Sequence, residues 1–272
     1  MNDAAKPATS ARMYDYYLGG THNFPADREA ASVVAQMAPS AAGSARSNRE
    51  FMQRAVRHIA GQGVRQFLDI GSGLPTQGNV HEVAETAIED AHVVYVDIDP
   101  VAVSESLEIL DGNTRATAIY GDLRNPQPIL EHAETRTLID FDQPVALLLA
   151  AVLHFVPDDV AYDVVAQLVR RLAPGSFLVL SHATLPEEAA GTDTELKDWR
   201  QRNQTSEAVY RQSTATQLVT RPRSEVLRFF EGVELVEPGL VWAQEWRPAA
   251  HEPTDFDNPA LSGILAGVGR VH

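Results

Sequence analysis

The chain contains no cysteine among its 272 residues. Disulfides, thiolate metal sites and cysteine nucleophiles are therefore excluded. No apolar run reaches the ~18 residues that a membrane span needs, and the first residues show no basic-then-apolar signal pattern. The histidines are scattered without the spacing of metal ligands. These absences predict a cytoplasmic protein with no membrane contact and no metal site.

Basic residues are also scarce. Lys and Arg together number 22 against 37 Asp and Glu, and the formal net charge is −15. A chain of this charge repels polyanions unless a local basic patch overrides the overall field. The densest basic cluster near the C-terminus, Arg221, Arg223 and Arg228, is small. We therefore expect no nucleic-acid partner and interpret the acid surplus mainly as a source of solubility.

Apolar runs alternate with amphipathic segments through the middle of the chain. We expect strands at 66–70, 93–97, 116–120, 145–149 and 177–181. Helices are expected between them at 79–88, 100–111, 129–138 and 158–172. The alternation predicts an α/β fold with a parallel sheet. The uninterrupted apolar run at 145–149 is typical of a strand buried on both faces.

The two ends of the chain depart from this pattern, and no internal repeat is visible. Before the sheet, helices are expected at 11–18, 25–37 and 46–61, with a small-residue linker at 39–44. After it, we expect a polar helix at 187–213, a short helix at 223–230, and a closing pair of strands at 233–236 and 241–246. A helical N-terminal segment attached to one α/β domain is the simplest partition.

The first strand leads through Asp69 into a turn that contains Gly71 and Gly73. Glycines let the backbone approach a ligand closely because they carry no Cβ. The next strand ends at Asp97, and an acid there can accept both hydroxyls of a ribose. A nucleoside-like cofactor is therefore expected. Leu74 and Pro75 stand where a dinucleotide fingerprint has its third glycine, which favours S-adenosylmethionine over NAD.

Three acids at three successive strand ends divide this cofactor between them. Asp69 is expected to hold the amine end, directly or through water, Asp97 the ribose, and Asp122 the exocyclic amine of the adenine. A glycine turn after a strand is often only a turn, and Asp97 or Asp99 could instead cap the next helix. We assign the cap to Asp99. The predicted cofactor-binding set is Tyr14, Asn23, Asp69, Gly71, Ser72, Gly73, Asp97, Ile98, Asp122, Leu123 and Ala151.

His154 is the candidate catalytic residue, because it follows the fourth strand and imidazole can act as a general base near neutral pH. A structural histidine packed under Phe155 explains the same position. Tyr14, Tyr17, Asn23 and Arg28 lie upstream of the sheet. They could form a lid hinged at Gly19 and Gly20, or a helix packed permanently on the domain.

The chain resembles the actinobacterial S-adenosyl methyltransferase family, once known as a domain of unknown function, within the class I S-adenosylmethionine-dependent methyltransferases. The matching segments are 11–20, 22–24, 27–28, 48–49, 66–76, 79–82, 95–100, 153–158, 223–230 and 235–239. Tyr17 departs from the family pattern, which has a leucine there, and the larger ring is expected to alter a lid contact.

The resemblance implies a Rossmann-like fold with a seven-stranded, mostly parallel sheet and helices on both faces. We expect an N-terminal helical segment or lid at 1–62, a methyltransferase domain at 63–250 and a C-terminal extension at 251–272. The acceptor would be a small molecule. Two alternatives stay open: a non-catalytic sensor that binds S-adenosylmethionine, and a nucleotide-dependent oxidoreductase. The oligomeric state and the methylated atom are not predicted.

Overall fold

The computed structural model describes residues 7–75, 78–184, 218–250 and 252–272. The helix expected at 187–213 lies outside the described residues. No helix among the described residues is both long enough and apolar enough to span a membrane.

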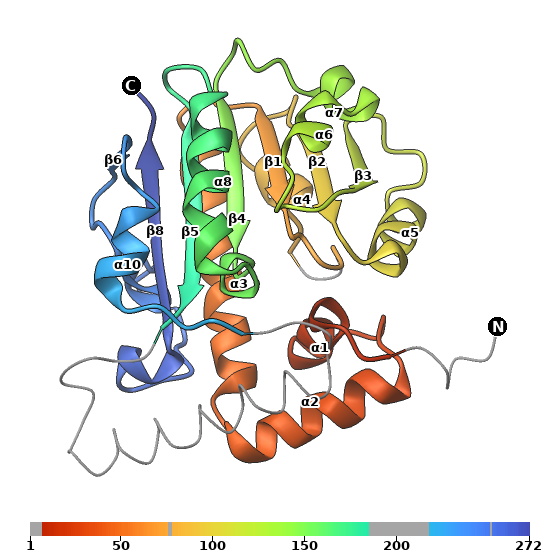
Figure 1. Cartoon of the computed structure of the whole chain (residues 1–272), viewed down its shortest axis with the longest axis vertical. Coiled ribbons are helices and arrows are strands. Elements are labelled where there is room, and N and C mark those ends of the chain that lie inside the picture. Colours follow the sequence, from red (N-terminus) through yellow and green to blue (C-terminus); the bar gives the residue numbers. More distant parts are fainter. Residues whose placement is uncertain (1–6, 76–77, 185–217, 251) are drawn as a thin grey trace.

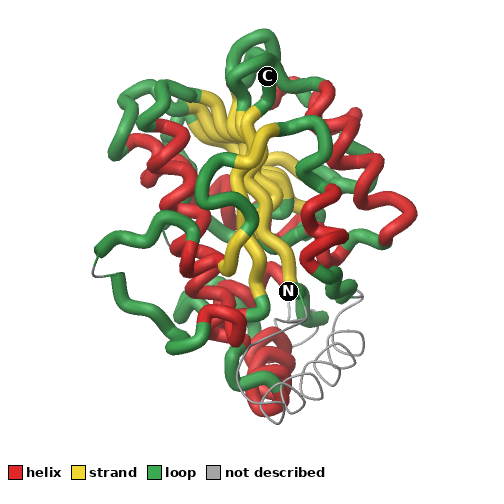
Figure 2. The backbone as a smooth tube through the Cα atoms, turned by 90° about the vertical axis from the view of Figure 1, so that its left-hand side faces the viewer, coloured by secondary structure: helices red, strands yellow, loops and turns green. Residues whose placement is uncertain are grey.

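One twisted sheet runs through the centre of the molecule, with helices packed on its two faces (Figures 1 and 2). The strand order is β3-β2-β1-β4-β5-β8-β6, and β7 also pairs with β8. Strands β1 to β5 are mutually parallel, whereas β8 is antiparallel to β5. The strands are β1 Gln66–Ile70, β2 His92–Asp97, β3 Ala116–Tyr120, β4 Val145–Ala150, β5 Phe177–Ala183, β6 Glu234–Leu235, β7 Val241–Trp242 and β8 Ile264–Arg270.

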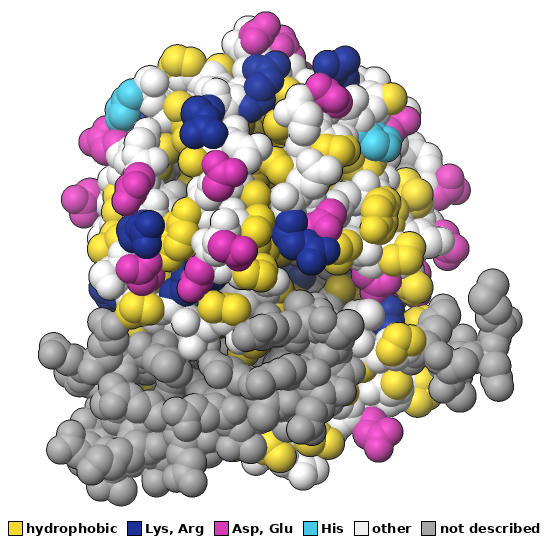
Figure 3. Space-filling model, in the orientation of Figure 1, with side chains coloured by type: hydrophobic (Ala, Val, Ile, Leu, Met, Phe, Trp, Pro, Cys, Tyr) yellow, Lys and Arg dark blue, Asp and Glu magenta, His cyan; other side chains and the backbone are white. Residues whose placement is uncertain are grey.

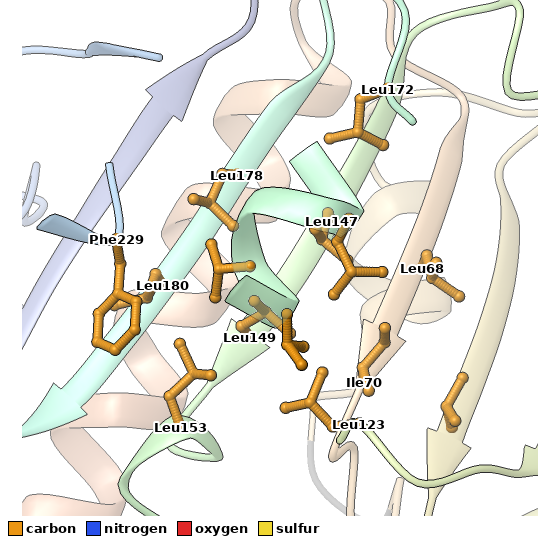
Figure 4. Packing of buried hydrophobic residues seen from close by; sticks show 14 of the residues in the cluster. Leu68, Ile70, Leu123, Leu147, Leu149, Leu153, Leu172, Leu178, Leu180 and Phe229 are labelled. Atoms are coloured by element: carbon orange, nitrogen blue, oxygen red, sulfur yellow. The ribbon is translucent and has the colours of Figure 1, made fainter. Parts of the chain in front are cut away.

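Two hydrophobic clusters, one on each face, hold the helices to the sheet. Helices α6, α7, α8 and α10 contribute to the first cluster, and α3, α4 and α5 to the second. Figure 4 shows leucines of β1, β4 and β5 directed toward α8 and Phe229 in the first cluster. The helices are α1 Ser10–Tyr17, α2 Pro25–Met37, α3 Ala41–Ala60, α4 Val80–Glu85, α5 Pro100–Ile109, α6 Gln127–Glu131, α7 Ala133–Leu138, α8 Asp158–Arg170 and α10 Arg223–Arg228.

Strand β4 shows why its sequence is uninterruptedly apolar. Val145, Leu147 and Leu149 belong to the first cluster. Ala146 and Leu148 belong to the second. Successive side chains of a strand point to opposite faces, and both faces are covered here. The central strand therefore has no solvent-facing position at which a polar residue would be favoured.

Helices α1 and α2 lie across the carboxyl ends of the parallel strands (Figure 1). The linker expected at 39–44 is mostly wrong, because α3 already begins at Ala41. Gly43 is small because of close packing: a Cβ there would lie 2.8 Å from Cζ of Phe256. The helix expected at 129–138 is divided into α6 and α7, which meet at His132.

The end of the chain contains the main departure from the predicted fold. The segments β6 and β7 do not pair with each other; both pair with β8, which lies between them and β5. The sheet thus has eight strands where seven were expected, since its last position is shared by two short segments. Residues 264–270, expected within a C-terminal extension, form this interior strand.

The glycines of β8 make this strand difficult to predict from the sequence. Gly267 and Gly269 interrupt its apolar pattern, and glycine usually weakens a strand. In the fold, a Cβ on Gly269 would lie 2.5 Å from Cγ2 of Val233, and one on Gly267 would lie 3.1 Å from Cζ of Phe230. These glycines are therefore required by the side chains that cover the strand.

Candidate functional site

A cavity of about 790 Å³ opens at the carboxyl ends of the parallel strands. This volume falls within the ~300–1,000 Å³ that is usual for small-molecule sites, and the place is where α/β sheets bind ligands. Helices α1, α2 and α3 supply the opposite wall. Of the residues predicted from the sequence, the cavity is lined by Tyr14, Asp69, Gly71, Ser72, Gly73, Asp97, Ile98, Asp122, Leu123, Ala151 and His154.

The glycine turn after β1 needs both of its glycines. Gly71 and Gly73 have φ of 76° and 60°, a region that side chains rarely adopt. A Cβ on Gly71 would also lie 2.2 Å from Cγ2 of Val152. The Gly73 amide donates to Oδ2 of Asp97 at 2.8 Å. The turn is thereby fixed to the end of β2.

Asp97 and Asp99 have the separate positions expected of them. Asp99 caps α5 by accepting from the Val101 amide at 2.9 Å. The Asp99 amide in turn donates to Oδ1 of Asp97 at 2.8 Å. Asp97 lines the cavity, and its burial raises its pKa. A carboxylate held by two backbone amides at a strand end is well placed to receive hydroxyl groups from a ligand.

Asp69 is buried, with 4% of its surface exposed. Burial raises the pKa of Asp69 to about 7, while Arg49 opposes this shift and Asp97 adds to it. Arg49, on α3, also lines the cavity and lies over the Tyr14 ring, with its Cζ 5.5 Å from the ring centroid. Its buried Nε has no hydrogen-bond partner in the structure.

Sequence reasoning gave Arg49 no role. Arg49 lies 20 positions before Asp69, on the helix expected at 46–61, and the amphipathic spacing of that helix indicated only packing. The one local signal was the Asn48-Arg49 pair that the chain shares with the family it resembles.

Asp122, at the end of β3, lies at the rim of the cavity. Its carboxylate accepts from Arg124, with Nη2 to Oδ2 at 2.6 Å and Nε to Oδ1 at 2.8 Å. These hydrogen bonds lower the pKa of Asp122. Asp122 is thus ionised and oriented by its neighbour.

A chain of four hydrogen bonds connects strand β4 to helix α1. The Ala151 amide donates to Oγ of Ser181 at 2.9 Å, and that hydroxyl donates to Oδ1 of Asn48. Nδ2 of Asn48 donates to the Tyr14 hydroxyl at 2.8 Å, which donates to the Ala45 carbonyl at 2.9 Å. The hydroxyls of Ser181 and Tyr14 each accept one of these hydrogen bonds and donate the next, so the orientation of the Asn48 amide is fixed. The Tyr14 proton is engaged by the Ala45 carbonyl.

This chain ends at a strained residue. Ala151 has φ of 54°, an uncommon value for a residue with a Cβ, and it lines the cavity. Such strain persists only where the surroundings hold it, and it is frequent at functional sites. The chain of hydrogen bonds holds the Ala151 backbone in this conformation.

The geometry of His154 does not favour the predicted role of general base. His154 lies in the short 3-10 helix η2, Leu153–Phe155. The Ala183 amide donates to its Nδ1 at 3.3 Å, so a neutral ring carries its proton on Nε2. Burial lowers the pKa of His154 well below its usual value, and His182 and Arg221 lower it further. A weak base protonated on Nε2 offers a hydrogen-bond donor.

Arg221 is buried and shapes the wall next to His154. It pairs with Asp158 at 2.7 Å and donates to the carbonyls of Leu153 and Val156 at 2.9 and 2.8 Å. Its Nη1 also donates to Nε2 of His182 at 2.7 Å. The sequence presented Arg221 as part of a basic cluster, but the fold uses it to bind two loops together.

Asn23 is the predicted site residue that does not line the cavity. Its Nδ2 donates to Oδ2 of Asp15 at 2.8 Å and to the Gly20 carbonyl at 2.9 Å. A Cβ on Gly20 would lie 2.0 Å from Oδ1 of Asp15. Asn23 and Gly20 therefore shape the turn after α1. Tyr17, the departure from the family pattern, is buried against α2 and also lines the cavity.

An open α/β sheet with a glycine turn after its first strand and a cavity-lining acid at the end of its second is typical of enzymes that use a nucleoside cofactor. The family model described as S-adenosyl methyltransferase matches residues 2–272. The chain belongs to this family and is an S-adenosylmethionine-dependent methyltransferase with the expected class I fold. The resemblance stated from the motifs is thereby confirmed.

Two solved structures are similar over nearly the whole chain. A proposed methyltransferase from Thermobifida fusca is 39% identical, with a TM-score of 0.86, covering 98% of this chain and 95% of its own. A DUF574 family protein from Streptomyces avermitilis is 34% identical, with a TM-score of 0.86 and full coverage of both chains. No curated protein matches the sequence.

Proposed function

We propose that the enzyme binds S-adenosylmethionine over the ends of β1, β2 and β3 and methylates a small molecule in the rest of the same cavity. The observation that carries this proposal is the sequence of groups along the cavity. Asp69 and the glycine turn follow β1, Asp97 ends β2 and Asp122 follows β3, and these strands are neighbours in the sheet in the order in which the cofactor's amino acid, ribose and adenine follow one another.

The residues present fit the amino-acid end of the cofactor. Arg49 and Asp69 provide one cation and one carboxyl, which match a carboxylate and an ammonium. The unpartnered Nε of Arg49 is a buried donor that a carboxylate would satisfy. Tyr14 would lie against this end through its ring, because its hydroxyl is engaged with Asn48 and Ala45.

When bound, the cofactor supplies a methyl group attached to a positively charged sulfur. The chain's own contribution is then to hold the acceptor in line with that group and to exclude water. Ala151 and Val152 line the cavity just before η2, and Val152 lies against Gly71 of the glycine turn. The low pKa of His154 suits a donor that orients an acceptor atom.

Asp97→Ala tests the placement of the cofactor. We expect the variant to bind S-adenosylmethionine more weakly by about 1.5–3 kcal/mol, the cost of losing hydrogen bonds to a charged group. Calorimetry measures the affinity, and thermal unfolding shows whether the variant is folded. The exposed Asp111→Ala is the control and should bind normally. Equal affinities in the two folded variants would refute the ribose role of Asp97, and binding of NAD by the wild type would refute the proposal.

A further inference from the structure

The cavity has two halves that differ in charge. Its ionisable Asp and Arg side chains lie on one side, at the ends of β1, β2 and β3 and on the facing turn of α3. They are Arg49, Asp69, Asp97, Asp99, Asp122 and Arg124. The other half lies over the ends of β4, β5 and β8. We call it the acceptor wall and define it by Ala41, Ser44, His154, Thr184, Val219 and Ser262.

Hydrogen bonds join the parts of the acceptor wall into one surface. Oγ of Ser44 donates to the Ser262 carbonyl at 2.6 Å, which links α3 to the start of β8. The Thr184 amide donates to the Gly263 carbonyl at 2.8 Å. The Val219 amide donates to the His154 carbonyl at 2.7 Å. Segments far apart in the sequence are therefore held side by side beneath the acceptor.

The described part of this wall carries no ionised side chain. Other lining residues of this half of the cavity include the small or apolar Val34, Ala38, Ala183, Gly263 and Ile264. His154 is neutral at physiological pH, because its environment disfavours the imidazolium. Arg221, a buried cation whose carbonyl accepts from Thr184, is absent from the lining and pairs with Asp158.

The hydroxyls of the wall are directed into the protein. Oγ1 of Thr184 donates to the Arg221 carbonyl at 2.6 Å. Oγ of Ser262 donates to the Pro259 carbonyl at 2.8 Å, and that of Ser44 is used as above. An ionic group placed here would lose its hydration without gaining an opposite charge, and such burial is costly.

We infer that the methyl acceptor is an uncharged, largely apolar small molecule, and that this wall discriminates against carboxylates, phosphates and ammonium groups. This inference rests on the proposed division of the cavity between cofactor and acceptor. It names the substrate class by what the wall can solvate. An apolar body is favoured by removal from water.

Three naphthalene probes of one shape test the inference. They are 2-naphthol, 2-naphthoate and the ammonium form of 2-naphthylmethylamine, each titrated calorimetrically into enzyme saturated with S-adenosylhomocysteine. We expect the neutral probe to bind at least about 10-fold more tightly than either ion, because the ions lose hydration without compensation. Equal or tighter binding of an ion would overturn the inference. So would a failure of the neutral probe to bind at millimolar concentration.

A pair of variants places the probe on the wall. Ala41→Asp introduces a carboxylate at a lining position in the first turn of α3, where an acid suits the helix dipole. Ala42→Asp makes the same change at the next residue, which does not line the cavity. Ala41→Asp should weaken binding of 2-naphthol about 10-fold, and Ala42→Asp should leave it unchanged. Equal effects of both variants would overturn the assignment of the wall.

The outcomes also separate this inference from the proposed function. Failure of the wild type to bind S-adenosylhomocysteine would refute the cofactor site itself. Normal binding of S-adenosylhomocysteine, together with a preference for an ionic probe, would refute only the neutral acceptor. Both aspartate variants should retain the affinity for S-adenosylhomocysteine, since neither position lies among the residues assigned to the cofactor.

Discussion

Asp69 combines burial with a position against the amine end of the proposed cofactor site. Its pKa is raised from 3.8 to about 7, so between these pH values the free folded enzyme holds a proton that the unfolded chain releases. The resulting contribution to stability is fully present below about pH 4 and is lost as the pH rises through about 7. A cationic ligand beside Asp69 favours the ionised form and reverses the shift.

We therefore predict that cofactor binding releases a proton at pH 6–7. Calorimetry at pH 6.5 in buffers of different ionisation enthalpy should detect about three quarters of a proton per S-adenosylmethionine bound. The release should vanish at pH 8.5, where Asp69 is already ionised in the free enzyme. It should also vanish in Asp69→Asn. A buffer-independent enthalpy in the wild type at pH 6.5 would contradict the prediction.

Two buried serines, Ser176 just before β5 and Ser181 within it, offer a matched comparison for the chain of hydrogen bonds. Ser181 accepts from the Ala151 amide at the cavity end of the sheet, and Ser176 accepts from the Val145 amide at the opposite end, at 3.0 Å. Each alanine substitution should destabilise the fold by about 1–3 kcal/mol, because a buried polar group loses a partner: the Val145 amide in Ser176→Ala, and Oδ1 of Asn48 in Ser181→Ala.

The prediction is that only Ser181→Ala also weakens binding of S-adenosylmethionine, by about fivefold or more, as expected for a coupling between linked groups. The reason is that the Ser181 hydroxyl connects Ala151 to Asn48 and, through Asn48, to Tyr14. Thermal unfolding and calorimetry on both variants supply the measurement. If the two variants bind equally well, the chain is structural only.

At the scale of elements, the N-terminal helices are fastened to the cofactor side of the sheet. Arg12, with 2% of its surface exposed, pairs with Asp27 at 2.9 Å and with Asp99 at 2.6 Å. It thus joins α1, the start of α2 and the cap of α5. Because the Asp99 amide also donates to Asp97, the proposed ribose site and the N-terminal helices are linked through two residues.

We predict that S-adenosylhomocysteine slows hydrogen exchange in residues 9–20, because these residues cover the cavity and are linked to Asp97. Mass spectrometry of the exchanged protein measures this, with α8 as the internal reference, since it does not line the cavity. Equal exchange with and without the ligand would identify α1 as permanent scaffold.

Arg12→Met should cost about 3–5 kcal/mol of stability, because it leaves two buried carboxylates without their cation.

At the scale of the whole molecule, acidic residues outnumber basic ones by 37 to 22. On the face shown in Figure 3, basic side chains stand singly among acidic and apolar ones. The three arginines that formed the densest basic cluster are each engaged. Arg221 pairs with Asp158 and Arg228 with Glu225, and Arg223 donates to the Leu240 carbonyl.

We predict no binding of DNA or RNA at physiological salt. Non-specific binding relies on the release of counterions by neighbouring cations, and this chain has a net charge of −15. Gel-shift titrations at about 0.15 M salt check this. Submicromolar, salt-sensitive binding to either nucleic acid would contradict it and would reopen the choice of acceptor.

The sequence by itself determined the parts of this protein that depend on neighbours along the chain. The five parallel strands follow from short apolar runs, the cap at Asp99 from an acid before Pro100, and the glycine turn from its two glycines. Together these predicted the lining of the cavity next to β1, β2 and β3, because the carboxyl ends of parallel strands meet at one edge.

Only the tertiary structure decided the features that depend on distant residues. Strand β8 could not be predicted because its glycines are explained by Val233 and Phe230, which pack on it from outside the strand. Arg49 faces Asp69 only once α3 lies across the sheet, and Asn23 turns toward Asp15 rather than the cavity. The acceptor wall brings residues of α3 and η2 together with Thr184, Val219 and Ser262. Local periodicity records which face of an element is buried, whereas the partner on that face is set by packing between elements.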